Sequence, residues 1–170
     1  MFISTLDLFK IAIGPSSSHT MGPMVAAKNF RDLLEKFASS NAVSDFLHVR
    51  CTLRGSLAFT GKGHATDRAV TLGMYRHTPQ ALAEVDVNTL FQELWQQSSF
   101  RTDNDRLIHF NPVEDIIFDR SDPLPEHPNG MIFQLLDGTG KTLLSETYFS
   151  IGGGFISTIA EIGQIVAPLK

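Results

Sequence analysis

A hairpin near the end of the chain is the feature that most constrains the fold. Residues 131–136 and 142–149 have the composition of strands, and they flank the sequence DGTG at residues 137–140. Asp-Gly between two such stretches is a strong signal for a tight turn between antiparallel strands. The later part of the chain is therefore expected to contribute neighbouring antiparallel strands to a sheet.

Helical patterns dominate the first half of the chain. Apolar residues recur at helical spacing from about Pro23 to residues 39–41, and shorter helices are expected after Ser4 or Thr5, from Thr66 to about Met74, and after Asp86 or Asn88. Thr66 is expected to cap its own helix. Alternation predicts a half-buried strand over residues 47–53 that ends before a glycine, and short strands are expected at residues 107–110 and 116–118.

Helices that precede paired strands predict an α+β domain, with a mainly antiparallel sheet and helices packed on one face. A length of 170 residues suits one such domain. The single cysteine, Cys51, excludes an internal disulfide and any cluster held by several thiolates of this chain.

The charge pattern argues against a nucleic-acid partner. Fourteen basic and 18 acidic residues give a net charge of −4, and the basic residues are scattered. No apolar run approaches the roughly 18 residues of a membrane span. The first residues also lack the features of a signal peptide, so a cytoplasmic protein is expected.

Residues 14–20, with the sequence GPSSSHT, place several hydroxyl groups and an imidazole just before a predicted helix. The N-terminus of a helix attracts anions, because free N–H groups and the helix dipole favour negative charge. Ser16, Ser17, Ser18 and His19 are therefore candidates for binding a carboxylate or phosphate. The alternative is ordinary capping of the helix by one of the hydroxyl groups, which leaves His19 unexplained.

Two further motifs carry histidines. His64 lies in the sequence GKGHATD at residues 61–67, where it could act as a general acid or base or be an exposed loop residue. His127 and Asn129, in the sequence EHPNG, offer donors and acceptors suited to the carboxylate and ammonium of an amino acid. A turn before the strand explains the same two residues, and this alternative remains open.

Other motifs have ordinary explanations. The sequence DGTGKT at residues 137–142 lacks the first glycine of a P-loop and leads into a strand, whereas a P-loop opens a helix. His48, His77 and His109 have no partner at metal-ligand spacing and are expected to be structural or surface residues.

Four segments resemble bacterial iron-sulfur L-serine dehydratases in the same order along the chain. They are residues 6–24, 55–67, 127–131 and 148–155, and together they span nearly the whole chain. In that family this region is the β domain, similar in fold to the allosteric substrate-binding domain of some phosphoglycerate dehydrogenases. A catalytic α domain follows it and holds a [4Fe-4S] cluster through its cysteines, so this chain resembles a regulatory half that is inactive alone.

The resemblance also implies residue roles. In the complete enzyme, the cluster iron that lacks a cysteine ligand binds serine and assists loss of its hydroxyl group, and the products are pyruvate and ammonia. His64 would be the base that reaches across to the cluster, and Ser16, Ser17, Ser18 and His19 would line the same interface. His127 and Asn129 match the pair expected to bind serine as an effector.

The resemblance divides the chain into a β domain over residues 1–155 and, from residue 156 to 170, the start of a linker to the absent α domain. The expected partners are that α domain, L-serine and a second copy in a homodimer. The competing interpretation is a free-standing amino-acid sensor without chemistry of its own.

Overall fold

The computed structural model describes residues 18–40, 45–60 and 65–166. The helices are α2 (Met21–Ser40), α3 (Ser56–Thr60), α4 (Thr66–Met74), the 3₁₀ helix η1 (Ala81–Glu84), α5 (Val87–Trp95), α6 (Pro112–Asp115) and α7 (Ile159–Val166). The strands are β1 (Leu47–Arg54), β2 (Ser99–Arg101), β3 (Leu107–His109), β4 (Ile116–Asp119), β5 (Gly130–Asp137), β6 (Thr142–Gly152) and β7 (Phe155–Thr158). In this part of the chain, no helix has the length and apolarity needed to cross a bilayer.

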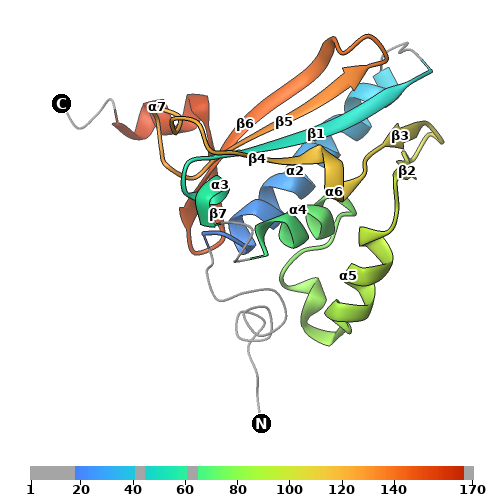
Figure 1. Ribbon diagram of the computed structural model, residues 1–170, viewed down its shortest axis with the longest axis horizontal. Coiled ribbons are helices and arrows are strands. Elements are labelled where there is room, and N and C mark those ends of the chain that lie inside the picture. The colour runs from blue at the N-terminus through green and yellow to red at the C-terminus, as the bar shows by residue number, and fades with distance from the viewer. Residues whose placement is uncertain (1–17, 41–44, 61–64, 167–170) are drawn as a thin grey trace.

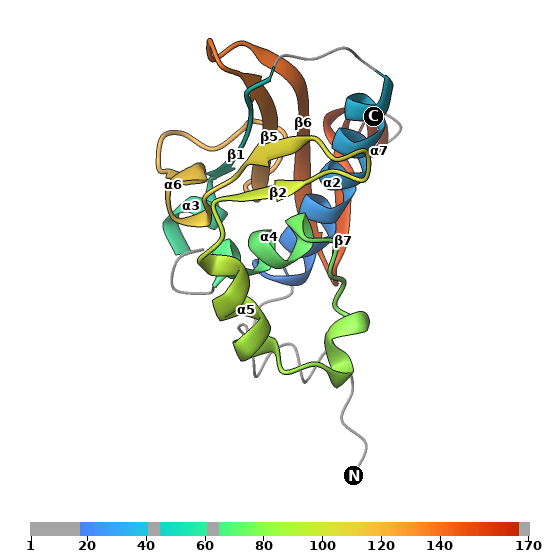
Figure 2. The same cartoon turned by 90° about the vertical axis from the view of Figure 1, so that its right-hand side faces the viewer.

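The described residues form one seven-stranded mixed sheet in the order β2-β3-β1-β5-β6-β7, with β4 also paired to β1. The β1–β5, β5–β6 and β6–β7 pairs are antiparallel, whereas β3 and β4 run parallel to β1. Figures 1 and 2 show α2 and α4 on one side of the long strands, with α5 farther out. The expected α+β fold with a mainly antiparallel sheet is therefore confirmed.

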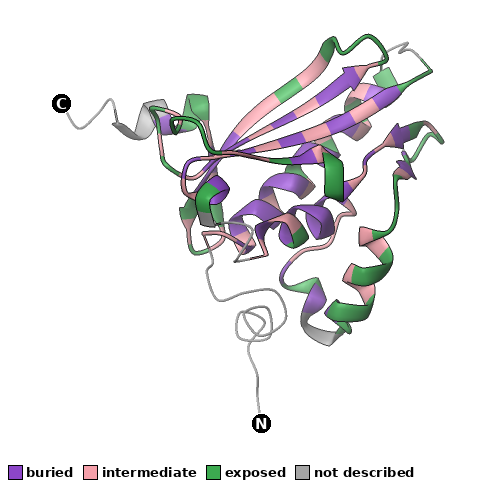
Figure 3. Cartoon of the chain, viewed as in Figure 1, coloured by how far each residue is buried: buried purple, intermediate pink, exposed green. Residues whose placement is uncertain are grey.

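The main core lies between the sheet and α2. Alternate residues of β1 are buried, as the period of a strand requires when one face is covered, and Figure 3 shows this alternation along the strand. Phe30 of α2 stacks on Phe133 of β5 with ring centroids 5.3 Å apart. Offset stacking of this kind adds to the free energy gained from burying both rings. Cys51 lies in the same core and is fully buried.

Most of the expected elements are present. Helices α2, α4 and α5, strands β1, β3 and β4, and the β5–β6 hairpin are confirmed near their predicted bounds. Residues 1–17, where the first helix was expected, lie outside the described part of the chain. Sequence reasoning missed β2, α3, η1, α6, β7 and α7, which are three to eight residues long.

The end of the chain differs from a simple linker. Gly152, Gly153 and Gly154 all have positive φ angles and form a tight turn. It returns the chain as β7, which pairs with β6 and leads into α7. The division at residue 155 remains a prediction, although part of the expected linker belongs to the sheet.

An ion-pair network fastens the end of α2 to two loops. The Glu35 carboxylate lies 2.9 Å from Arg31 Nε and 2.7 Å from Arg76 Nη2. Arg76 donates two hydrogen bonds of 2.9 Å to the Asp103 carboxylate, and these lower the pKa of Asp103 below its ordinary value of 3.8. The bonds between Arg76 and Asp103 therefore stabilise the fold only while the Asp103 carboxylate is ionised.

The lowered pKa of Asp103 predicts that the stability of the fold decreases at low pH. Because the pKa of Asp103 is lower in the folded than in the unfolded chain, its contribution is full above the unfolded pKa and is lost as pH falls through the folded pKa. Asp103→Asn should lower the melting temperature near neutral pH, by a small amount because the pair is exposed, and the difference should vanish in acid.

Melting curves recorded between about pH 6 and pH 2.5 test this expectation. Asp105→Asn is the control, because the ion pair between the Asp105 carboxylate and Arg101 is long, at 3.5 Å, and also exposed. A constant difference between Asp103→Asn and the parent at every pH would contradict the role given to Asp103.

Candidate functional site

The four segments at residues 6–24, 55–67, 127–131 and 148–155 are called the first to fourth motifs. The first motif is described from residue 18 onward, where it forms a turn that leads into α2. Ser18 Oγ lies 2.8 Å from His19 Nδ1, so the hydroxyl group and the imidazole hold each other. The carbonyl oxygen of Thr20 accepts the hydrogen bond of Met24 N at 3.0 Å and so begins the helix. Ser16 and Ser17 lie outside the described residues.

The second motif meets this turn at the start of α4. Thr66 Oγ1 donates a 2.6 Å hydrogen bond to the carbonyl oxygen of His19. The prediction that Thr66 caps α4 is wrong, because the N-cap is Ala65, which has a φ of 62° and makes no side-chain cap bond. The hydroxyl group of Thr66 instead bonds to a separate loop. His64 lies outside the described residues.

The third motif is a turn that is bonded to β6. Asn129 N donates to His127 Nδ1 at 3.0 Å, which gives the side chain of His127 a structural role in the turn. Asn129 Nδ2 donates to the carbonyl oxygen of Ser150 at 3.2 Å, and Ser150 N donates to the carbonyl oxygen of Asn129 at 3.0 Å. These bonds support the turn interpretation, because they fix the backbone before β5.

Both side chains nevertheless keep a polar atom that these bonds do not use. Since Nδ1 of His127 accepts a hydrogen bond, the neutral ring carries its proton on Nε2. Asn129 uses its amide nitrogen, and within the described part of the chain its Oδ1 makes no hydrogen bond. Both residues are partly exposed. An N–H donor and a carbonyl acceptor therefore remain for a ligand.

Two glycines allow the motif segments to approach closely. A Cβ atom at Gly22 would lie 2.0 Å from Ser150 Oγ, and one at Gly55 would lie 2.0 Å from the carbonyl oxygen of Pro128. Ser56 N donates to that same carbonyl oxygen at 2.9 Å. Side chains at these two positions would hold the segments apart, so the glycines are a condition of the contact.

The four motifs therefore meet in one junction at one end of the sheet. His19 contacts Thr66, Gly22 contacts Ser150, and Ser150 is bonded to Asn129. The adjacent Pro128 is bonded to Ser56. Segments that lie far apart in sequence are thus neighbours in space. We call this cluster of residues 18–22, 55–56, 65–66, 127–129 and 150 the motif junction.

Sequence reasoning did not single out Ser150 or the tertiary bond of Thr66. Ser150 is fully buried, and its Oγ has no hydrogen-bond partner within the described part of the chain. Its neighbours in sequence belong to a strand pattern, which gives no sign of a contact with α2. For Thr66 the available sign was misleading, because a threonine at a helix start normally predicts a cap.

His48 and His109 lie apart from these motifs. His48 Nε2 is 2.6 Å from Asp115 Oδ1, and the ring of His109 stacks on Phe46 with centroids 4.4 Å apart. His48 is the second residue of β1, whereas Gly55 and Ser56 of the motif junction follow the last residue of that strand. His48 therefore lies at the opposite end of β1 from the junction. The expected structural or surface role of both histidines agrees with these contacts. The described residues contain no group of three side chains able to hold a metal ion.

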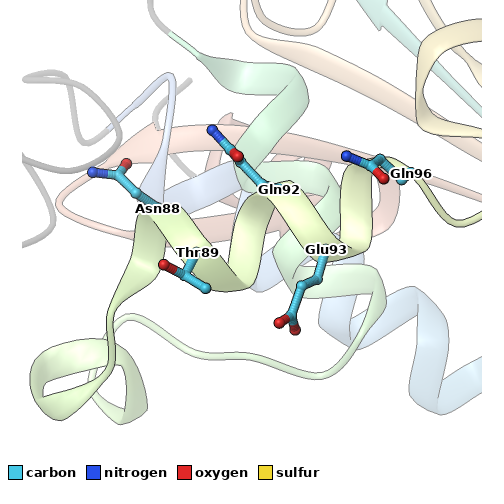
Figure 4. Close-up of a pocket in the computed structure, with 5 residues that line it drawn as sticks. All are labelled: Asn88, Thr89, Gln92, Glu93 and Gln96. Atoms are coloured by element: carbon cyan, nitrogen blue, oxygen red, sulfur yellow. The ribbon is translucent and has the colours of Figure 1, made fainter.

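The hollow along α5 does not mark the site. A hollow of about 330 Å³ is lined by Asn88, Thr89, Gln92, Glu93 and Gln96. Figure 4 shows these side chains along α5 and, for Gln96, at the residue that follows it. No second element closes it, and none of these residues belongs to a motif. Ligand sites are usually concave and enclosed by several elements, so this hollow is not a candidate.

The fold and the junction define an α+β domain whose sequence motifs gather at one end of a mixed sheet. The chain belongs to the serine dehydratase beta chain family, which matches residues 4–161. The family resemblance expected from the sequence is therefore confirmed.

Relatives in several bacteria agree with this assignment. The chain is 44% identical over 156 residues to L-serine dehydratase TdcG of Escherichia coli, covering 91% of this chain and 33% of the relative. It is 37% identical over 162 residues to an L-serine dehydratase of Helicobacter pylori, covering 95% and 34%. An L-serine dehydratase of Streptomyces coelicolor is 38% identical over 156 residues, covering 92% and 34%. The chain thus spans about a third of the length of these relatives.

Proposed function

We propose that this chain is the β domain of an L-serine dehydratase that converts L-serine to pyruvate and ammonia. The observation that carries the proposal is the motif junction, where all four segments that resemble the dehydratases meet. A domain selected only for packing would not require its motif loops to lie together. The names of the relatives support the same activity.

The residues of the junction suit a substrate with a carboxylate. Ser18 and His19 stand at the N-terminus of α2, where the helix dipole favours negative charge. With Ser16 and Ser17, they would line the face toward the catalytic domain. His64 would take the α-proton of serine as its hydroxyl group leaves, giving an enamine that tautomerises and is hydrolysed to pyruvate and ammonia.

The side chains of this chain do not fit the ligand set of a [4Fe-4S] cluster. Such a cluster requires several thiolates, and the sequence contains one cysteine. Burial raises the pKa of the Cys51 thiol, which favours the protonated form over the thiolate that binds metals. We therefore assign the cluster to an α domain that lies outside this sequence.

The proposed activity is tested with pyruvate formation from L-serine. The complete dehydratase, loaded with its cluster, is expected to form pyruvate, and this chain alone is expected to form none. Absence of pyruvate from the loaded complete protein would contradict the proposal. Pyruvate formed by this chain alone would contradict the division of roles between the two domains.

His127 and Asn129 would bind serine as an effector. The Nε2–H group of His127 suits the carboxylate, and Oδ1 of Asn129 suits the ammonium group. Both side chains are fixed by the turn and by β6, so the site would be preorganised. Serine would regulate the enzyme only if it bound two conformations of the protein with different affinities.

Asn129→Ala in the complete enzyme is expected to change the dependence of rate on serine, or its sigmoidality, and to leave the saturated rate nearly intact. The bond to the Ser150 carbonyl is also lost, so the melting temperature should fall, with a cost of about 1 kcal/mol. Steady-state curves and thermal melts of the same variant measure both effects.

Asn111→Ala provides the matched control. Asn111 is also a turn asparagine, and its side chain caps α6 by accepting a 3.1 Å bond from Val113 N. It should lower stability by a similar amount without changing the serine curve. If Asn129→Ala gave the same pattern as Asn111→Ala, the His127–Asn129 turn would be purely structural.

A free-standing amino-acid sensor is the second candidate, and the same unused donor and acceptor at His127 and Asn129 favour it. Titration calorimetry of this chain with L-serine, combined with the pyruvate assay, separates the two functions. Binding of serine without pyruvate formation by the complete protein would support the sensor. The proposed homodimer is tested by sedimentation of the complete protein.

A further inference from the structure

A single hydroxyl group joins two of the four motifs. Thr66 Oγ1 donates to the His19 carbonyl oxygen across 47 positions of sequence, at 2.6 Å. Thr66 is fully buried and His19 is half-buried, so the donor side of this bond is shielded from water. Loss of the donor would leave the His19 carbonyl oxygen without this partner, which costs free energy.

The geometry around Thr66 is unusual for a helix start. A threonine in this region normally caps its own helix, but α4 begins after Ala65, whose left-handed backbone is uncommon for a residue with a Cβ atom. The hydroxyl group is thereby directed to the loop of His19. Threonine is stiff at χ1, so the bond fixes the separation of the two backbones.

The segment that Thr66 holds is itself ordered by local bonds. Ser18 Oγ contacts His19 Nδ1, and the next residue, Thr20, begins the hydrogen bonding of α2. A shift of the His19 backbone would therefore move the Ser18–His19 pair relative to the start of α4. Misplacement of a substrate-binding group by about 1 Å can lower a rate by about 100-fold.

We infer that Thr66 is a positioning residue for the dehydratase reaction, acting through the His19 backbone. It holds the Ser18–His19 turn in place against the first residue of α4. The inference rests on the proposed function, since it concerns how that site is assembled. Thr66 itself would not touch the substrate.

The test compares three variants of the complete, cluster-loaded enzyme. Thr66→Val keeps the shape of the side chain and removes the donor, and Thr66→Ser keeps the donor. Thr71→Val is the matched control, because Thr71 is also fully buried in α4 but donates at 2.8 Å to Asp67 within its own helix. Steady-state kinetics, melting temperature and hydrogen exchange of residues 18–24 are measured for each.

Thr66→Val is expected to lower kcat by about 10- to 100-fold and to speed exchange in residues 18–24. Thr66→Ser should recover most of the rate. Thr71→Val should lower the melting temperature to a comparable extent while leaving kcat and that exchange near the parent values. If Thr66 had only a structural role, Thr66→Val and Thr71→Val would have the same effect on kcat and on the exchange of residues 18–24.

Equal effects of Thr66→Val and Thr71→Val on kcat and on exchange would overturn the inference. If the unsubstituted enzyme formed no pyruvate, the proposed function would fail. Hydrogen exchange would then decide the inference alone: faster exchange of residues 18–24 only in Thr66→Val would support the positioning role, and unchanged exchange would refute it.

Discussion

His64→Ala in the complete dehydratase is expected to lower kcat by about 10²- to 10⁴-fold, the usual loss when a general base is removed. The expectation follows from the proposed role of His64 as the group that takes the α-proton of serine. Thr66, two residues after His64 in the same motif, bonds to the turn of Ser18 and His19. This motif therefore meets the turn that is the candidate for binding a carboxylate. Turnover at saturating serine and the melting temperature are both measured.

His109→Ala serves as the control for His64→Ala. Its imidazole stacks on Phe46 and lies on β3, apart from the motif junction. It should affect stability more than turnover. An unchanged kcat for His64→Ala, with a loaded and active parent enzyme, would reduce His64 to a loop residue and would require another base.

The fold was largely predictable from the sequence because its longest elements have clear periods. The alternation over Leu47–Arg54 and the hairpin around Asp137 depend on local chemistry, and both are present in the structure. The short strands β3 and β4 were predicted, but β7 was not, since a strand of four residues has too few side chains to show a clear period. Its position is set by the turn at Gly152–Gly154 and by pairing with β6.

The composition of the candidate site was predictable, but its assembly was not. Hydroxyl, imidazole and amide groups near glycines can be identified as motifs one at a time. Their meeting depends on tertiary contacts that leave no local pattern, such as the approach of Gly22 to Ser150. Thr66 shows the limit best, because the local rule predicts a cap and the tertiary contact takes precedence.

Gly55→Ala has the largest expected effect on stability. Gly55 has a φ of 61°, which costs an L residue about 1 to 2 kcal/mol. The new Cβ atom would also lie 2.0 Å from the carbonyl oxygen of Pro128, a backbone atom that cannot rotate away. Overpacking of this kind adds about 1 to 3 kcal/mol. Denaturant unfolding should therefore show a total loss of about 2 to 5 kcal/mol.

Gly140→Ala separates the two causes of that loss. Gly140 also has a positive φ, of 87°, but no atom lies within 4 Å of its new Cβ atom. Its cost should be the backbone term alone, about 1 to 2 kcal/mol. The excess loss in Gly55→Ala over Gly140→Ala then measures the contact between the second and third motifs.

The clash between the new Cβ atom of Gly55→Ala and Pro128 is also expected to affect function. Relief of the clash must move Pro128, and the Ser56–Pro128 hydrogen bond holds the turn that carries His127 and Asn129. Gly55→Ala should therefore alter the serine dependence of the complete enzyme, whereas Gly140→Ala in the distant β5–β6 hairpin should not. Equal stability losses for the two variants, with unchanged serine curves, would show that the close approach of Gly55 to Pro128 is relaxed at little cost. The motif junction would then not depend on this contact.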